Sequence, residues 1–110
     1  MTYEVRLQPR AKLQLYKAAL WWAENRSAEQ AVRWLEGFEA ALQLLAHNPE
    51  RWPLCPERDS APCEIRQITY GLGRTKTHRA VFAIRQDKVV VYAIRHLAQD
   101  VLTADDFSES

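Results

Sequence analysis

The side chains best suited to chemistry lie in the second half of the chain, where two histidines each neighbour an arginine. His78 precedes Arg79 at the start of one apolar run, and Arg95 precedes His96 at the end of the next. Metal-free RNA cleavage needs a proton acceptor, a cation beside the developing phosphorane charge and a proton donor. These residues can supply the three groups only if they converge, so the simpler alternative is a pair of solvent-facing strand ends.

Charge is distributed unevenly in this region. Between residues 66 and 95 there are seven Lys or Arg residues against one acid, whereas residues 96–110 hold four acids and no Lys or Arg. Arg66, Arg79 and Arg85 are therefore candidates for gripping a phosphate or an acidic partner through bidentate contacts. Alternatively, they pair with nearby acids such as Glu64 or with the acids near the C-terminus.

The bulk composition indicates a single globular domain. The chain has 110 residues, of which 47% are hydrophobic and 26% charged, and its net charge of +1 favours no particular partner. No secretory leader or membrane-length apolar run is visible, so we expect a cytoplasmic protein that does not enter a membrane. Cys55 and Cys63 flank a proline-rich loop and are expected to be free thiols, and their spacing predicts no metal site.

The first half of the chain predicts a strand and a helix that lead into this region. Residues 3–8 alternate apolar and polar side chains like a half-buried strand, and residues 10–24 show helical periodicity. Trp21 falls on the polar side of that helix, which makes it a candidate for contact with a partner. The apolar stripe of the helix, expected to face the core, consists of Leu13, Tyr16, Ala19, Leu20 and Ala23.

A second helix is predicted to begin at Ser27, because Ser27 and Gln30 form a capping-box pattern. It should end near His47, since Asn48 precedes a proline and is disfavoured in helical conformation. Its apolar positions, which keep the spacing of one buried helix face, are Ala31, Trp34, Leu35, Phe38, Leu42 and Leu45. The two helices therefore form an antiparallel hairpin.

Three strand-like runs follow the proline-rich loop, at residues 63–70, 78–85 and 88–96. The last two are joined by a tight turn, which should bring their distant ends, with His78 and His96, side by side. The predicted fold is α+β in the order β-α-α-β-β-β, with a helical hairpin packed on a largely antiparallel four-stranded sheet.

At this level of detail the chain resembles the RelE/ParE superfamily of toxins and plasmid stabilisation proteins. The likeness covers about residues 3–100 and rests on the order of several short motifs rather than on any one of them. In chain order these are "YEVRL", the helical hairpin, "NPERWP", "EIRQITYG", "HRAVFAIRQDKVVVYAIRH" and "RHLAQD". It implies one toxin domain at residues 1–100, followed by an acidic tail at residues 101–110.

The resemblance implies the toxin of a type II toxin–antitoxin system, neutralised by a cognate antitoxin. ParE-like members act on DNA gyrase, whereas RelE-like members cut mRNA on the ribosome without a metal. Here Gln99 stands where nuclease members place a further arginine, and no tyrosine follows Tyr92. These departures favour a ParE-like mode that binds a cellular target, and no cofactor is implied.

Two alternatives stay open at this point. The first is a ribosome-dependent mRNA endonuclease that would use Arg66, Arg79, Arg95 and His96. The second is a degenerate member that retains only antitoxin binding. In either the favoured or the degenerate mode, the residues expected to contact a partner are Trp21, Arg66, Arg79, Arg85 and Arg95.

Overall fold

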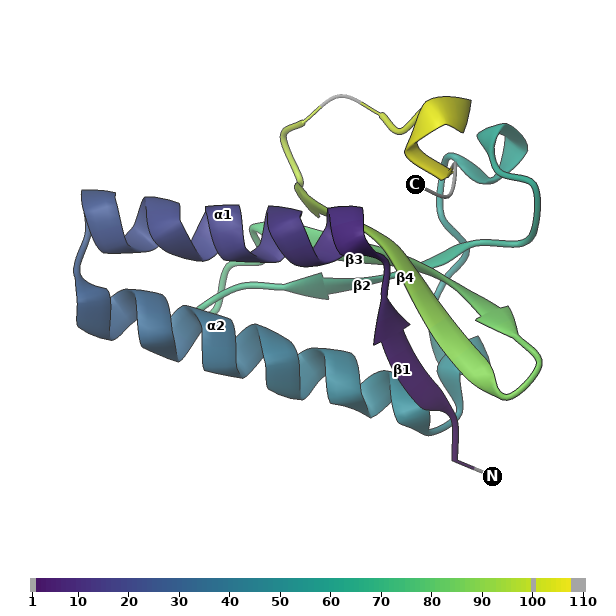
Figure 1. Cartoon of the computed structure of the whole chain (residues 1–110), viewed down its shortest axis with the longest axis horizontal. Helices are drawn as coiled ribbons and strands as arrows, with labels where there is room; N and C mark the ends of the chain where they lie inside the picture. The colour runs from purple at the N-terminus through teal and green to yellow at the C-terminus, as the bar shows by residue number, and fades with distance from the viewer. Residues whose placement is uncertain (1, 100, 108–110) are drawn as a thin grey trace.

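The computed structural model describes residues 2–99 and 101–107, and its elements follow the predicted order (Figure 1). They are β1 (Glu4–Leu7), α1 (Pro9–Asn25), α2 (Ala28–Gln43), β2 (Arg66–Tyr70), β3 (His78–Arg85) and β4 (Lys88–His96). The α+β prediction is therefore confirmed, with both helices inserted between the first strand and the other three.

The four strands form one sheet in the order β1-β4-β3-β2. The three later strands pair antiparallel, while β1 pairs parallel with β4 at the edge of the sheet. A parallel pair needs a long connection, and here it comprises the helical hairpin, the proline-rich loop and the strands β2 and β3. Arg85 lies opposite Lys88 beside the turn between β3 and β4, and a β-bulge at Val81–Phe82 shifts the register by one residue. His78 therefore lies opposite His96, and these strand ends are side by side as predicted.

The second helix covers the sheet with the stripe that the sequence predicts. The Ser27 hydroxyl accepts a hydrogen bond from the Gln30 amide at 3.1 Å and caps its first turn. On its inner face, Trp34, Phe38 and Leu42 are buried against the sheet.

Gly37 lets this helix approach β2 closely. Any side chain at this position would overlap the hydroxyl of Tyr70, which donates a hydrogen bond to the Trp34 carbonyl at 2.9 Å. The glycine therefore costs helix propensity but permits the closest contact between α2 and the sheet.

The expected buried face of α1 is wrong. Leu13, Tyr16 and Leu20 are 55%, 49% and 56% exposed, whereas the helix buries Ala11 and Leu15. Small side chains on the inner face let α1 lie close to α2 and β4. The larger apolar side chains that periodicity favoured are left on the outer face, here called the outer α1 stripe and defined by Leu13, Tyr16 and Leu20.

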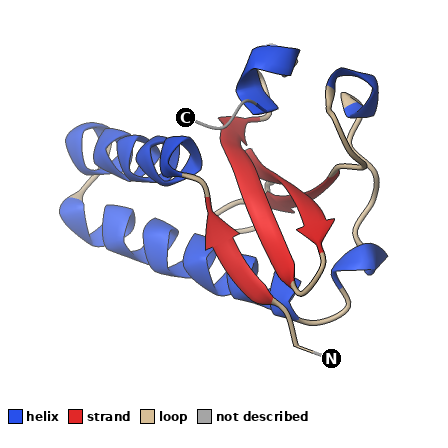
Figure 2. Ribbon diagram, turned by 45° about the vertical axis from the view of Figure 1, so that its right-hand side comes forward, coloured by secondary structure: helices blue, strands red, loops and turns tan. Residues whose placement is uncertain are grey.

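A second core lies on the sheet face opposite the two long helices (Figure 2). Residues of the proline-rich loop and of the C-terminal segment cover this face, where Val81 and Tyr92 project from the sheet. Leu102 is 1% exposed, and Phe107 packs on Tyr92 with ring centroids 5.6 Å apart. Part of the segment that the sequence set apart as an acidic tail is thus core of the same domain.

A buried ion pair joins the parts of this second core. Arg79 of β3 forms a two-pronged contact with Glu57 of the loop, one branch of which is 2.8 Å long. The same carboxylate accepts a hydrogen bond from the Leu102 amide at 2.8 Å. Glu57 therefore connects the loop, the sheet and the C-terminal segment.

We expect Glu57→Gln to lower the free energy of unfolding by roughly 3 kcal/mol, because it leaves the buried Arg79 without a countercharge. Urea unfolding at neutral pH measures the change. The matched control is Glu64→Gln, which removes an exposed carboxylate from Arg66 and should cost less than about 1 kcal/mol. Equal losses in the two variants would contradict a structural role for the buried pair.

The hydrogen bonds from Arg79 lower the pKa of Glu57 from 4.5 to about 2. The unfolded chain therefore takes up this proton at a higher pH than the folded protein does. The stability that Glu57 contributes is complete above about pH 5 and is lost as the pH falls toward about 2. The gap in unfolding free energy between the wild type and Glu57→Gln should accordingly shrink as the pH is lowered through this range.

Candidate functional site

The strand pleat separates the predicted catalytic residues onto two faces of the sheet. His78 and His96 lie opposite each other and point toward the helices, as do Ala80 and Phe82 further along. Arg79 and Arg95 are also opposite each other, but successive side chains of a strand point to opposite faces. The two arginines therefore lie on the side of the second core, away from both histidines.

The predicted arginines also hold partners within the molecule. Arg79 is 8% exposed and is bound to Glu57. Arg66 donates to the Trp52 carbonyl at 2.6 Å and pairs with Glu64 at 3.0 Å.

The two remaining arginines are held in the same way. Arg95 lies 3.8 Å from Asp106 of the C-terminal segment, and Arg85 donates to the Tyr92 hydroxyl at 3.1 Å. None of the four lines the pocket that contains the histidines.

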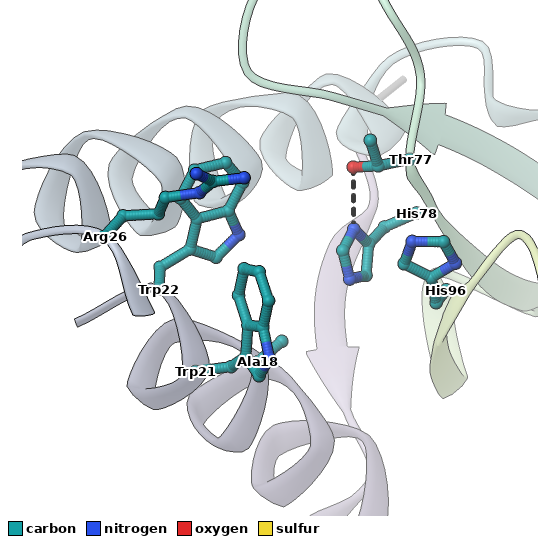
Figure 3. Close-up of a pocket in the computed structure, with 7 residues that line it drawn as sticks. All are labelled: Ala18, Trp21, Trp22, Arg26, Thr77, His78 and His96. Carbon is teal, nitrogen blue, oxygen red and sulfur yellow. Dashed lines mark hydrogen bonds between the residues drawn. The ribbon is translucent and has the colours of Figure 1, made fainter. Parts of the chain in front are cut away.

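That pocket, of about 470 Å³, lies between the end of α1 and the ends of β3 and β4 (Figure 3). One wall is formed by residues of α1 and by Arg26, which caps its C-terminal end. The other wall is formed by the ends of the two strands. The lining residues are Ala18, Trp21, Trp22, Arg26, Thr77, His78 and His96. We call it the His–Trp pocket.

Each wall of the His–Trp pocket rests on the main core. Trp22 stacks on the buried Trp34 with centroids 6.5 Å apart, and Trp21 meets Trp22 edge-on at 5.8 Å. His78 contacts Trp34 at a centroid distance of 5.1 Å. Trp21 itself is half exposed, as the sequence predicts.

The two imidazoles present different chemistry. The His96 Nδ1 accepts a hydrogen bond from the Ala98 amide at 3.0 Å, so its neutral ring carries the proton on Nε2 and offers a donor there. The His78 Nδ1 lies 2.8 Å from the Thr77 hydroxyl. Burial, with a smaller contribution from the neighbouring His96, lowers the pKa of His78 from 6.5 to about 4. His78 is therefore an uncharged ring at neutral pH.

Sequence reasoning singled out His78, His96 and Trp21 of this pocket. Ala18 and Trp22 are four residues apart on one flank of α1, which is the signal that would have located this flank of the helix. Arg26 follows the last residue of the helix, so helical spacing does not place it. Thr77 had no such signal, because its place depends on the strand register.

Two negative findings complete the description. Within residues 2–99 and 101–107, no three His, Cys, Asp or Glu side chains gather as a metal site would require. Over the same residues, no helix has the length and apolar character needed to cross a bilayer.

A histidine titration followed by NMR tests the geometry of the pocket. The His78 ring should keep its neutral signal as the pH falls from about 8 to 5 and titrate only near 4. His96→Asn removes a nearby charge and should move that midpoint upward, though burial keeps it below the ordinary value. A His78 midpoint near 6.5 in the wild type would show that the ring is solvated and that the pocket is not formed as described.

Comparisons with known proteins agree with the fold. A family model described as "ParE toxin of type II toxin-antitoxin system, parDE" matches residues 5–101. A solved structure, "Chromosomal ParDE TA system from P. aeruginosa", is similar with a TM-score of 0.66 at 14% sequence identity, over 86% of this chain and 96% of that chain. No match was found among curated protein sequences. Because the family model spans most of the sequence, the chain belongs to the family of ParE toxins of type II toxin–antitoxin systems.

Proposed function

We propose that this toxin acts by binding a cellular target, with DNA gyrase as the candidate, rather than by cutting RNA. The observation that carries the proposal is the separation of Arg79 and Arg95 from His96 by the strand pleat. A nuclease built on these residues needs them around one phosphate, yet each arginine contacts an acid on the far side of the sheet. Gyrase as the target comes from the family resemblance, and no single residue here selects it.

We further propose that the cognate antitoxin covers the outer α1 stripe and Trp21. Four large apolar side chains on one short helix are exposed by about half each. Exposed apolar groups gathered in this way commonly mark a protein interface, and aromatic anchors contribute much of the binding energy there. Lys12 and Lys17 flank the stripe, which favours an antitoxin segment with acidic residues along its edges.

Two assays on the purified protein test the proposed mode of action. We expect the toxin to inhibit supercoiling of a relaxed plasmid by gyrase and to leave mRNA intact in a translation extract. Arg79→Ala and His96→Ala are the diagnostic variants, because mRNA cleavage that either variant abolishes would establish the nuclease alternative instead. A protein that neither cuts mRNA, nor inhibits gyrase, nor slows growth when expressed alone would be the degenerate antitoxin binder.

Trp21→Ala tests the antitoxin surface. We expect binding of the cognate antitoxin to weaken by roughly thirtyfold, or about 2 kcal/mol, because a half-exposed indole is removed from the interface. The unfolding free energy should change by less than about 0.5 kcal/mol, as is usual at the surface. Val32→Ala is the matched control, since Val32 is an exposed apolar residue on α2 and should affect neither quantity. Equal losses of binding and stability in Trp21→Ala would refute the interface.

A further inference from the structure

The His–Trp pocket continues into a second cavity of about 270 Å³ along the same flank of α1. The two cavities share Ala18, His78 and His96. Beyond these residues the second cavity is lined by Gln14 and Lys17 of α1 and by the end of β4. Together they form one elongated depression, which we call the α1–β4 groove. Its length favours a segment of polypeptide over a compact small molecule.

Among the described residues, the Lys and Arg side chains that line this groove have no acidic residue beside them in its lining. Arg26 lies at one end and Lys17 at the other, and no Asp or Glu lines either cavity. Both cations are exposed, and neither takes part in an ion pair within the described residues. This differs from the arginines of the second core, which have acidic partners. An occupant should therefore bring a negative charge to each end.

The middle of the groove is aromatic. Trp21, Trp22, His78 and His96 surround it, and Ala18 leaves space between them (Figure 3). His78 is neutral at physiological pH, so its ring offers an uncharged aromatic face beside the two indoles. Such a site suits the flat, apolar surface of an aromatic side chain.

The spacing of the two cations sets the spacing of their partners. The helix rises by about 12 Å from Lys17 to Asn25, and Arg26 is the C-cap residue that follows. An extended chain covers the same distance in about four residues, and its side chains at alternate positions share one face. We propose that the α1–β4 groove binds an extended segment of a partner protein in which an aromatic residue is flanked, two positions away on each side, by acidic residues.

This inference rests on the proposed function, because it describes the chemistry of a partner that the toxin contacts through α1. The probe that tests it is the synthetic peptide acetyl-Ser-Glu-Ser-Phe-Ser-Glu-Ser-amide. Binding is measured by NMR titration of the full-length toxin, which reports an affinity and shows whether the His78 and His96 ring signals move.

Four changes should weaken or abolish binding. Replacing the phenylalanine of the peptide by alanine should cost at least about tenfold in affinity, because the ring fills the groove. Arg26→Gln and Lys17→Gln should each cost about threefold, as expected for exposed ion pairs. Ala18→Trp fills the centre and should abolish binding. Lys12→Gln is the matched control, because Lys12 is an exposed cation of α1 outside the groove and its loss should have no effect.

The charge pairing can be checked one end at a time. A peptide in which one glutamate is replaced by glutamine should become insensitive to either Lys17→Gln or Arg26→Gln, and should stay sensitive to the other. The peptide in which the other glutamate is replaced should show the reverse pattern. This crossed pattern would also fix the direction in which the segment runs.

Several results would overturn the inference. They are the absence of peptide binding at millimolar concentration, equal effects of Lys12→Gln and the two groove variants, or stronger binding of a thymidine tetranucleotide than of the peptide. A toxin that inhibits gyrase but gives any of these results would reject the groove inference and leave the proposed function standing. Peptide binding by a protein without toxic activity would reject the proposed function alone.

Discussion

The alternation of side chains along the β3–β4 hairpin is the constraint on which the rest of the structure depends. Within one pair of strands, neighbouring positions in the sequence serve opposite faces. His78 and His96 are directed to the side of the long helices, and Arg79 and Arg95 to the side of the loop and C-terminal segment. The two side chains of His78–Arg79, and those of Arg95–His96, therefore point to opposite faces of the sheet and cannot act on one bound group.

On the arginine side of the sheet, the guanidinium groups are bound to partners within the molecule and do not form an open basic surface. Glu57 accepts hydrogen bonds from Arg79 and from the Leu102 amide, and Asp106 lies near Arg95. A buried guanidinium needs such partners, because an unpaired charge in a dry environment costs several kcal/mol. The acids of the loop and of the C-terminal segment thus pair with Arg79 and Arg95. From the sequence alone, these arginines would be expected to be available to a nucleic acid.

The helix side has a different character, because α1 carries apolar groups around most of its circumference. Ala11 and Leu15 pack inward, the outer α1 stripe is exposed, and Trp21 lines the α1–β4 groove. One helix therefore offers two adjoining surfaces, one apolar with basic edges and one aromatic with a cation at each end. Both surfaces are compatible with a toxin of a type II toxin–antitoxin system, which has a cognate antitoxin as its partner.

The sequence by itself determined the features that depend on neighbours along the chain. Periodicity located the elements and the buried stripe of α2, and the tight turn after Arg85 predicted that the strand ends with His78 and His96 lie side by side. The register shift at Val81–Phe82, which pairs these two histidines, was not predicted. Trp21 was predicted to be exposed because it is out of phase with the stripe of Leu13, Tyr16 and Leu20, but that stripe is itself exposed, so the half exposure of Trp21 has another cause.

Only the tertiary structure decided which face of α1 is buried, that β1 lies parallel to β4, and that Glu57 neutralises Arg79 across 22 positions. The physical reason is that each of these features depends on how segments distant in the sequence pack together. The local sequence is compatible with more than one arrangement, and shape, burial and the pairing of charges select among them.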